Sequence, residues 1–374
     1  MALKVLYIHG NSLNPGGTET FMLNYYRHMD PNLIHIDFAV HGGAGYYDEE
    51  ILNHGSKILK KKKKSINPIA YELQMRDIYL NNQYSIVHSH VDAMGAWELK
   101  LAKRYGVPVR IAHCHSTGHQ TKSILKYQLN ELARKRINKY ANIRLACAGD
   151  AGRWLFGNRN FTIIHDAIEV EKFSFNDNVR NKIRLNYNIT KEDFVIGNVG
   201  RLAPEKNQFF LLEVLELLIK ENRHYKLMLV GDGDQRRRLE KVAAEKHLKE
   251  NVIFVGQVFG ASDYYNAFDY FALPSLFEGL GIVLIEAQCN GLHCMSSIRA
   301  PKEANVTGNV IYLPLDAQAW ADYLSALNFN QLKRENSKQK VIDAGYSIDN
   351  EAQKLQSIYL NSCDSNSSLD SCGM

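Results

Sequence analysis

Short apolar runs recur along almost the whole chain, separated by polar or glycine-containing segments. Runs of four to eight residues rich in β-branched and aromatic side chains predict buried strands. They fall into two series. The first comprises residues 3–9, 33–40, 84–88, 109–113, 143–146 and 161–164. The second comprises residues 194–199, 226–230, 252–255, 270–273, 292–296 and 310–313.

Amphipathic stretches of helical length lie between these runs. They cover residues 18–29, 69–80, 122–138, 207–220, 235–247 and 317–327. Strands that alternate with helices predict parallel sheets covered by helices on both faces, the doubly wound α/β class. Two series predict two such domains, joined near residues 165–190. Such sheets bind ligands beyond the carboxyl ends of their strands, so we expect a ligand-binding cleft between the domains.

The expected domains are residues 1–165 and 166–346. A further amphipathic helix is expected over 349–360, within a C-terminal segment 347–362. The remaining residues, 363–374, are rich in Ser, Asp and Asn and are expected to form a disordered tail.

Composition agrees with a globular protein. Of the 374 residues, 45% are hydrophobic and 23% are charged, which excludes a disordered or fibrous chain. The net charge of +5 is too small to indicate nucleic-acid binding.

The first apolar run is too short for a signal peptide, and no run approaches the ~18 apolar residues of a membrane-spanning helix. The six cysteines form no CxxC pair, so we expect reduced thiols and a cytoplasmic protein.

The most informative local pattern follows the strand at 270–273. The loop carries Glu278, Gly279 and Gly281, and an apolar helix begins there, with Glu286 on it. Glycine N–H groups at a helix start favour an anion such as phosphate. Glu286 would lie roughly 8 Å into the helix, so the two carboxylates could hold two ends of one polar ligand. An ordinary helix start with one favourable and one solvated Glu remains an alternative.

Two cations follow another strand end. Arg201 lies just after the strand at 194–199, and Lys206 precedes the next helix. A guanidinium and an ammonium at one edge suit a diphosphate whose departing charge needs stabilisation. Ordinary surface cations are the alternative. In the first half, Gly16 and Gly17 lie between strand and helix and could approach a phosphate, or could form a simple turn capped by Thr18.

Histidines follow two strands of the first half. His88 and His90 form one H-x-H pair, His113 and His115 another, and His119 follows. Such pairs could bind a metal, but no carboxylate or cysteine pattern accompanies them. We therefore expect no metal, with His115, His90 and His119 lining the cleft as neutral hydrogen-bonding groups. His88 and His113 are expected to be core histidines.

Basic charge gathers in the first half. Residues 60–64 are five consecutive lysines, and several Lys and Arg residues lie on the helix expected over 122–139. The same helix carries the apolar residues Ile124, Leu125, Tyr127, Leu129 and Leu132. A basic amphipathic surface suits anionic lipid head groups. A solvated helix face is the alternative.

Taken together, Arg201 with Lys206, Glu278-x7-Glu286 and the Gly16-Gly17 loop resemble the retaining family-4 glycosyltransferases of the GT-B fold. The segments 164–169, 254–257, 286–291 and 345–348 fit the same family, so the resemblance covers nearly the whole chain. Within the family the chain most resembles the EpsF-type transferases of bacterial exopolysaccharide and capsule assembly. It departs from the family pattern at His165-Asp166-Ala167 and at His293.

The resemblance implies a fold of two Rossmann-like domains facing a central cleft, with the C-terminal segment crossing back to the first domain. Glu286 would bind the ribose of a nucleotide-sugar, and Glu278 with the amides of 279–281 would hold the donor sugar and phosphate. Arg201 and Lys206 would stabilise the departing diphosphate in place of a metal ion. The implied roles of the other positions are donor binding at Gly16, Gly17, Gly200 and Leu280, a donor-sugar contact at His115, and acceptor-side contacts at His90 and His119.

The implied activity is retaining, metal-independent transfer of a hexosyl group, with no cofactor. The donor is expected to be a UDP-sugar, with a GDP-sugar as the alternative, and the acceptor a glycan or polyprenyl-diphosphate-linked saccharide. Another GT-B enzyme, such as a nucleotide-sugar epimerase or a glycoside phosphorylase, and a non-catalytic scaffold of an assembly complex are the alternatives. We expect peripheral contact with the inner face of the plasma membrane through residues 60–64 and the 122–139 helix, and no nucleic-acid partner.

Overall fold

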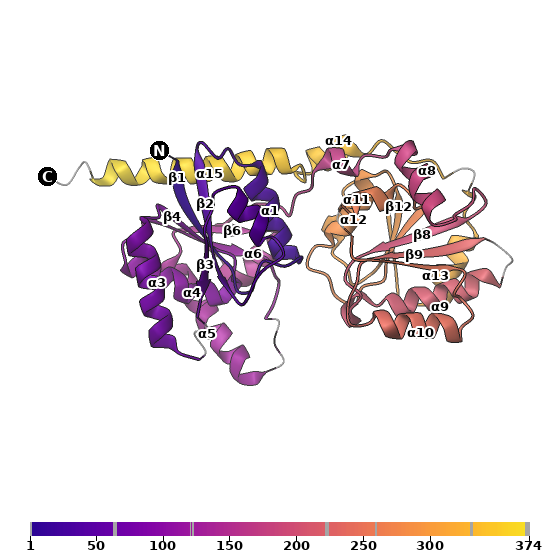
Figure 1. Cartoon of the computed structure of the whole chain (residues 1–374), viewed down its shortest axis with the longest axis horizontal. Coiled ribbons are helices and arrows are strands. Elements are labelled where there is room, and N and C mark those ends of the chain that lie inside the picture. The colour runs from indigo at the N-terminus through magenta and orange to yellow at the C-terminus, as the bar shows by residue number, and fades with distance from the viewer. Residues whose placement is uncertain are drawn as a thin grey trace. The chain divides into compact units, whose positions relative to one another are not determined.

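The chain folds into two compact α/β units (Figure 1). The computed structural model describes residues 2–62, 66–119, 121, 123–220, 224–258, 260–329 and 332–370, and for 364–370 the backbone alone. Unit 1 comprises Met1–Ala167 with Ile348–Met374, and unit 2 comprises Ile168–Ser347. The first boundary between the units therefore falls two residues after the expected one at residue 165. The second falls one residue after the expected one at residue 346.

Unit 1 is built on one parallel sheet. Its described strands are β1 (Leu3–Ile8), β2 (Ile34–His41), β3 (Ile58–Lys61), β4 (Ile86–Ser89), β5 (Val109–Cys114), β6 (Ile143–Ala146) and β7 (Thr162–Ile163), in the order β3-β2-β1-β4-β5-β6-β7. The helices are α1 (Gly17–His28), α2 (Asp48–Asn53), α3 (Pro68–Asn82), α4 (Gly95–Arg104), α5 (Ile124–Tyr140), α6 (Gly149–Phe156) and α15 (Ile348–Asp370), with a 3-10 turn η1 (Asp92–Met94).

Unit 2 repeats the plan. Its described strands are β8 (Phe194–Val199), β9 (Tyr225–Val230), β10 (Val252–Gly256), β11 (Tyr270–Leu273), β12 (His293–Ser297) and β13 (Val310–Leu313), in the order β10-β9-β8-β11-β12-β13. Its helices are α7 (Val170–Phe173), α8 (Asp177–Asn186), α9 (Gln208–Ile219), α10 (Arg236–Glu245), α11 (Ser262–Tyr265), α12 (Ile282–Cys289), α13 (Ala317–Ser325) and α14 (Lys338–Asp343), with 3-10 turns η2 (Pro204–Lys206) and η3 (Lys302–Ala304).

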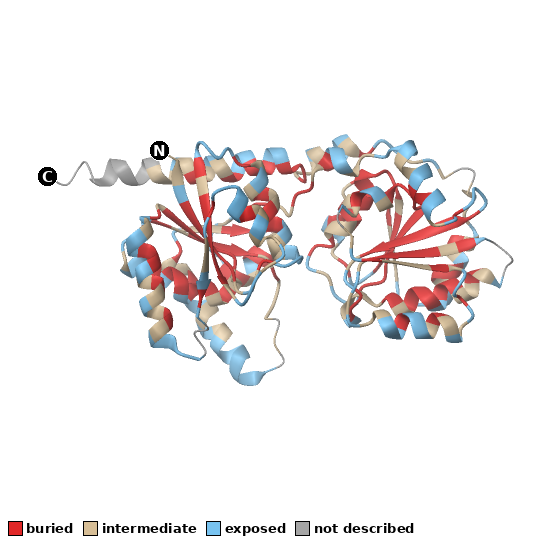
Figure 2. Ribbon diagram, viewed as in Figure 1, coloured by how far each residue is buried: buried red, intermediate tan, exposed pale blue. Residues whose placement is uncertain are grey.

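Each sheet is buried on both faces, as Figure 2 shows for the central strands. Successive strand residues point to opposite faces, so a doubly covered strand needs apolar side chains at every position. In β1, Val5 and Tyr7 join the hydrophobic cluster on one face, while Leu6 and Ile8 join that on the other. This explains why the central strands read as continuous apolar runs rather than alternating ones.

The expected strands and helices are confirmed. Several shorter helices, α2, α4, α6, α7, α8, α11 and α14, were not among those expected, and two further points need correction. Strand β3 was not expected, because its sequence Ile-Leu-Lys-Lys carries two of the lysines from the run at 60–64. Lysine is common on edge strands, where charge discourages pairing with another chain. The second correction concerns the C-terminus. Helix α15 continues to Asp370, past the expected end at residue 362, where we expected a disordered tail.

Helix α15 belongs to unit 1, although unit 2 separates it in sequence from the rest of that unit. Ile348, Ala352, Leu355 and Tyr359 are buried in the same cluster as Tyr7. The C-terminal segment therefore completes the core of the first unit. Among the described residues, no helix combines the length and the apolar character needed to cross a bilayer.

Candidate functional site

In both units the predicted residues gather where the strand order reverses. In unit 1 the first strand, β1, lies between β2 and β4, and in unit 2 the first strand, β8, lies between β9 and β11. At such a switch point the loops after the two adjacent strands run in opposite directions and leave a crevice for a ligand. The loops after β1 and β4 carry His9 and His90, and those after β8 and β11 carry Arg201 and Glu278.

The switch point of unit 2 brings Lys206 and Glu278 together. Lys206 Nζ lies 2.8 and 2.9 Å from the two carboxylate oxygens of Glu278. Ser275 Oγ donates to Glu278 Oε1 at 2.6 Å. The Glu278 side chain is only 7% exposed and that of Lys206 25%, so the pair is held in a partly desolvated place where electrostatic interactions are strong.

Arg201 lies at the same edge but has a different partner. Its guanidinium pairs with Glu205 four residues on, and two thirds of the side chain is exposed. Among the described residues no ion pair joins Arg201 to Glu278. The backbone nevertheless links the loops, because Leu276 N–H donates to the carbonyl of Glu205 at 2.8 Å. The loop that carries Arg201 is therefore joined to the loop that carries Glu278, while the Arg201 side chain itself is paired with Glu205 and largely exposed.

A third loop, missed by the sequence analysis, fixes the one that carries Arg201. Leu202 N–H donates to the carbonyl of Asp232 at 3.0 Å. A Cβ on Gly231 would lie 2.1 Å from the Gly200 carbonyl oxygen, and one on Gly233 would lie 2.4 Å from that of Leu202. Only glycine permits this approach. The signal was present as Gly-Asp-Gly-Asp directly after a strand.

Glycine also shapes the start of α12. Gly281, the residue before the helix, has φ of +80°, a left-handed conformation that favours glycine. The preceding Leu280 is buried in the core and anchors the loop, while Gly279 is exposed. The expected helix start near Gly281 is confirmed. Its amides and those of the loop are available at a positive helix end, the arrangement that attracts a phosphate.

Glu286 lies on α12 and is held from one side. Tyr265 Oη donates to Glu286 Oε2 at 2.5 Å. Burial raises the pKa of Glu286 to about 7, while the hydrogen bond from Tyr265 acts in the opposite direction. A carboxylate with one oxygen fixed in this way can accept hydrogen bonds from a pair of ligand hydroxyls.

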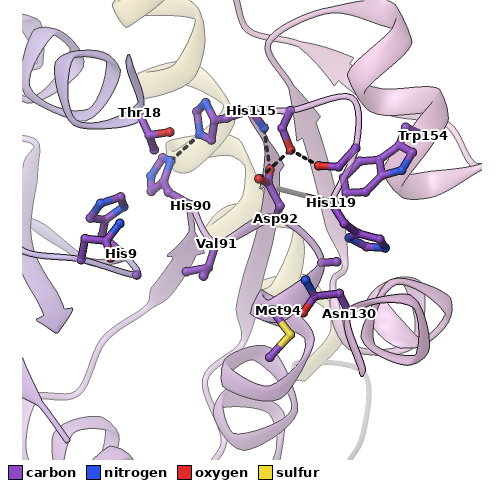
Figure 3. A pocket seen from close by; sticks show the side chains of 15 residues that line it. His9, Thr18, His90, Val91, Asp92, Met94, His115, His119, Asn130 and Trp154 are labelled. Atoms are coloured by element: carbon purple, nitrogen blue, oxygen red, sulfur yellow. Dashed lines mark hydrogen bonds between the residues drawn. The ribbon is translucent and has the colours of Figure 1, made fainter. Parts of the chain in front are cut away.

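The switch point of unit 1 holds a cavity of about 270 Å³ (Figure 3). Its wall comes from the loops after β1, β4 and β5 and from α1, α5 and α6. The lining residues are His9, Gly10, Asn11, Thr18, His90, Val91, Asp92, Ala93, Met94, His115, Ser116, Gly118, His119, Asn130 and Trp154. The predicted His90, His115 and His119 are thus brought together. Among these described residues there is no Lys or Arg, and the lining combines neutral polar groups with apolar side chains such as Met94 and Trp154.

Asp92 positions the loop that carries His115, and the sequence analysis did not single it out. Its Oδ1 accepts from the His115 backbone N–H at 2.7 Å, and its Oδ2 accepts from Ser116 Oγ at 2.9 Å. Asp92 itself has φ of +44°, an uncommon conformation that Asp tolerates better than most residues. Its carboxylate is therefore committed to the loop.

The His115 ring is buried and hydrogen-bonded to its neighbour. His90 Nδ1 and His115 Nε2 are 3.0 Å apart, and Asp166 Oδ1 lies 4.0 Å from His115 Nδ1. Burial lowers the pKa of His115 to about 3, and burial raises the pKa of Asp166 to about 7. At neutral pH His115 is therefore an uncharged imidazole, which can donate from one nitrogen and accept at the other.

His119 is fixed at the opposite side of the cavity. Its Nε2 lies 3.2 Å from Glu131 Oε2. Its ring packs edge-on against Trp154, with 5.0 Å between the ring centroids. Arg134 binds both Glu131 oxygens and donates to the Trp154 carbonyl at 2.7 Å. Helix α5 is thereby tied to the cavity wall.

The Gly16-Gly17 loop lies at the start of α1, next to the cavity residue Thr18. Gly16 is extended, and a Cβ there would lie 2.5 Å from Glu19 Oε2. Glu19 in turn pairs with His9 at 2.9 Å. A Cβ on Gly17 would meet open space. The side chain of Glu19 therefore occupies the position next to the loop that we expected to approach a phosphate.

The first turns of α5 project into solvent (Figure 2). Residues 123–129 are all exposed, and five large apolar side chains each expose at least half of their area, namely Ile124, Leu125, Tyr127, Leu129 and Leu132. Further along the helix the exposed residues are basic, Lys135, Arg136 and Lys139. The spacing of 125, 129, 132, 136 and 139 places them on one face.

The lysine run at 60–64 presents fewer unpaired positive charges at the surface than we expected. Lys60 binds Asp48 at 2.8 Å, and Lys61 is buried at the end of β3. Forming the edge strand turns alternate side chains inward, which removes Lys61 from the surface. Lys63 and Lys64, like Lys122 before α5, lie outside the described residues.

Comparisons with known proteins agree on the family. The family model described as "Glycosyltransferase Family 4" matches residues 15–171, and that described as "Glycosyl transferases group 1" matches residues 179–346. The chain is 32% identical to the putative glycosyltransferase EpsF of Bacillus subtilis, over 95% of this chain and 96% of that protein. It is 26% identical to the capsular polysaccharide biosynthesis glycosyltransferase CapH of Staphylococcus aureus, over 96% and 99% of the two chains.

Solved structures show the same fold. HepE of Anabaena in complex with UDP superimposes with a TM-score of 0.78 at 17% identity, over 96% of this chain and all of that chain. Sucrose-phosphate synthase of Thermosynechococcus elongatus gives a TM-score of 0.75 at 17% identity, over 96% and 98% of the two chains. Two Rossmann-like units, the two matched family models and a full-length relative together show that the chain belongs to the GT-B glycosyltransferases of family 4, of the EpsF type.

Proposed function

We propose that the protein transfers a hexosyl group from a UDP-sugar to a hydroxyl of a lipid-linked saccharide, with retention of configuration, during assembly of a bacterial exopolysaccharide or capsule. Unit 2 provides the main donor site, and unit 1 binds the acceptor and contributes His115, Gly16 and Gly17 to the donor. The names of the relatives support this context, because EpsF and CapH are both described as glycosyltransferases and CapH as one of capsular polysaccharide biosynthesis.

The observation that carries the proposal is the Lys206–Glu278 pair at the switch point of unit 2. The two groups lie 72 residues apart in sequence and meet at 2.8 Å beside the glycine-rich start of α12. Glu278 is proposed to accept from donor-sugar hydroxyls. Lys206, joined by Arg201, is proposed to stabilise the nucleoside diphosphate as it leaves, a task that otherwise falls to a divalent metal ion.

The proposed reaction breaks the bond between the anomeric carbon and the phosphate oxygen and forms a bond from that carbon to the acceptor oxygen. The acceptor proton passes to the phosphate oxygen that departs. Attack on the face of the leaving group retains configuration without a covalent glycosyl–enzyme intermediate. His115, neutral by burial, is proposed to orient the donor sugar by hydrogen bonding, and Gly16, Gly17, Gly200, Gly279 and Gly281 to let the backbone approach the phosphates.

Two similar proteins support UDP as the nucleotide. HepE of Anabaena was crystallised with UDP and with UDP-glucose. A relative from Escherichia coli is named as the enzyme that uses UDP-Gal and α-D-GlcNAc-diphosphoundecaprenol; it is 24% identical over 75% of this chain and 76% of that protein. Glu286 would bind the ribose hydroxyls that every nucleotide donor presents.

The cavity of unit 1 suits an uncharged saccharide. Its volume of about 270 Å³ lies just below the ~300–1,000 Å³ usual for drug-sized ligands, which fits a group of monosaccharide size. Its histidines and Asn130 can exchange hydrogen bonds with sugar hydroxyls, and Trp154 offers an apolar surface to a sugar ring. We propose that His90 and His119 hold the acceptor saccharide there.

Membrane contact is proposed for α5. Its exposed apolar first turns would enter the head-group region, while Lys135, Arg136 and Lys139 would bind anionic lipid. Asn130 on the same helix lines the cavity, so a saccharide carried by a membrane lipid would be presented next to its binding place. This would locate the protein at the inner face of the plasma membrane.

The activity is tested by incubating the protein with UDP-hexoses and a synthetic polyprenyl-diphosphate saccharide. We expect UDP release only when both are present, and an NMR spectrum of the product with the anomeric configuration of the donor. UDP release without acceptor and with a rearranged sugar would instead identify an epimerase. No turnover of any donor, with intact folding, would indicate a scaffold.

The membrane contact is tested by sedimentation with phosphatidylglycerol-containing vesicles. Reversing Lys135 and Arg136 to Glu should lower the bound fraction, because each basic residue near an anionic surface contributes about 1 kcal/mol. Leu125→Ser with Leu129→Ser should lower it too, including at high salt. Lys241→Glu on α10 is the matched control. Equal sedimentation of all variants would leave α5 as a solvated helix.

A further inference from the structure

Three buried histidines of unit 1 form a cluster that the proposed function does not use in full. His88 lies on β4, His90 begins the loop after β4, and His113 lies on β5. One ring nitrogen from each lies within 4.8 Å of one from each of the others. The cluster lies on the face of the sheet that carries Tyr7, because Tyr7 pairs with His88 in the register of β1 and β4.

The geometry within the cluster is specific. His88 Nε2 and His113 Nδ1 are 3.1 Å apart, and their rings are nearly parallel, at 4°. The other nitrogen of His88 lies 2.5 Å from Tyr359 Oη on α15. Tyr359 donates its hydroxyl proton to Tyr7 at 3.0 Å, so its oxygen is free to accept from His88 Nδ1–H. His88 Nε2 therefore carries a lone pair that points at His113.

The cluster leaves polar atoms without partners. His90 Nε2 and His113 Nε2 are buried and make no hydrogen bond to any described residue. His88 and His113 are fully buried and His90 is 4% exposed. Buried polar groups are nearly always hydrogen-bonded or bound to an ion, because an unpaired one costs about 1–3 kcal/mol. Mutual hydrogen bonds thus satisfy the three rings only in part.

We propose that His88, His90 and His113 form a binding site for one divalent transition-metal ion of the Zn²⁺ type. Neutral imidazole is a preferred ligand for Zn²⁺, at about 2.0–2.1 Å from metal to nitrogen. Two such ligands in a tetrahedral site lie about 3.3 Å apart, close to the 3.1 Å between His88 Nε2 and His113 Nδ1. In the metal-free protein His113 Nδ1 carries the proton of this hydrogen bond, and that proton would move to His113 Nε2, which has no partner among the described residues, when the ion binds.

Tyr359 provides the second hydrogen bond that usually orients a metal-binding histidine. Such a histidine usually donates its second N–H to an oxygen, which fixes the ring and raises its basicity. His88 makes this contact with Tyr359, which belongs to the C-terminal helix. The ion would therefore join β4 and β5 to α15. His90 contacts His115 through Nδ1, so its Nε2 would bind the ion, and in the metal-bound protein the contact with the acceptor saccharide would fall to His119.

The test uses the full chain after removal of bound metal with a chelator and dialysis. Calorimetry with Zn²⁺ should give one equivalent of tight binding, and Co²⁺ should give the visible absorption of a tetrahedral site. His113→Asn should abolish both signals. The matched control is His247→Asn, an exposed histidine with φ of +58°, a conformation that Asn tolerates well.

A second variant covers the case in which His113→Asn fails to fold. Tyr359→Phe removes one hydroxyl and keeps the ring, and it should weaken Zn²⁺ binding by about tenfold or more. Stoichiometric binding unchanged in His113→Asn, unchanged affinity in Tyr359→Phe, or a spectrum typical of octahedral Co²⁺ would overturn the proposal. Each readout is independent of donor and acceptor, so it can fail or succeed separately from the transferase activity.

Discussion

The two units share one architecture but differ in the chemistry of their switch points. In unit 2 the loops after β8 and β11 carry ion pairs, Lys206 with Glu278 and Arg201 with Glu205. In unit 1 the loops after β1, β4 and β5 carry imidazoles, and no Lys or Arg is among the described residues that line the cavity. The same sheet edge is thus proposed to serve a charged ligand in one unit and a neutral one in the other.

This difference shows where the specificity of a doubly wound fold resides. The sheet supplies a position, and the residues one or two places beyond each strand decide what binds there. Ammonium and guanidinium groups suit a diphosphate, whereas uncharged histidines suit a polyol. Substitutions at the switch point of unit 2 should therefore act mainly on the donor, and substitutions at His90 and His119 in unit 1 on the acceptor.

The largest expected effect is in unit 2. Lys206→Ala should lower turnover by about 10²–10³-fold, because it removes a charge that is proposed to stabilise the leaving group. Arg201→Ala should also remove most turnover. Both are measured as UDP release with saturating substrates. Lys241→Ala, on the exposed face of α10, is the control. Unchanged turnover in both variants would refute their assignment to the diphosphate.

Glu286→Gln should weaken UDP binding by about tenfold, as measured by calorimetry. In the free protein the pKa of Glu286 is raised to about 7, so wild-type affinity should increase between pH 6 and pH 8 as the carboxylate ionises. The variant should lose this increase. The raised pKa also affects stability. Between about pH 4.5 and 7 the folded protein keeps a proton on Glu286 that the unfolded chain releases, so the contribution of Glu286 to stability falls as pH rises through this range. A parallel pH dependence in the variant would contradict the assignment.

Asp92→Asn tests the neutral site of unit 1. Asn keeps the shape and tolerates the left-handed backbone, but its NH₂ group cannot accept as one carboxylate oxygen does. The loop of His115 should loosen, with kcat lowered about fivefold and the Kd for UDP unchanged. A change in UDP affinity without a change in kcat would contradict the assignment of UDP binding to unit 2.

The smallest effect is expected from magnesium. Because Lys206 and Arg201 are proposed to take the charge of the leaving group, adding Mg²⁺ or Mn²⁺ to chelator-treated protein should change turnover by less than about twofold. The assay is again UDP release. Strict dependence on Mg²⁺ would show that these cations are insufficient in unit 2.

The sequence by itself determined the class of fold, the number of units and most elements, because buried parallel strands must read as apolar runs and their helices as amphipathic ones. It also predicted the loops that carry the candidate residues, since strand ends are visible in the pattern. Strand β3 was missed because an edge strand needs little apolar surface and tolerates lysine.

Only the tertiary structure decided which of these residues meet. Lys206 contacts Glu278 because β8 and β11 are neighbours, and Tyr359 reaches His88 because α15 packs on unit 1. Parallel strands that are buried on both faces look alike in sequence, so their order leaves no local signal. The pairing of Arg201 with Glu205, the position of Asp92 and the histidine cluster depend on that order and on side-chain packing, which emerge only when distant segments come together.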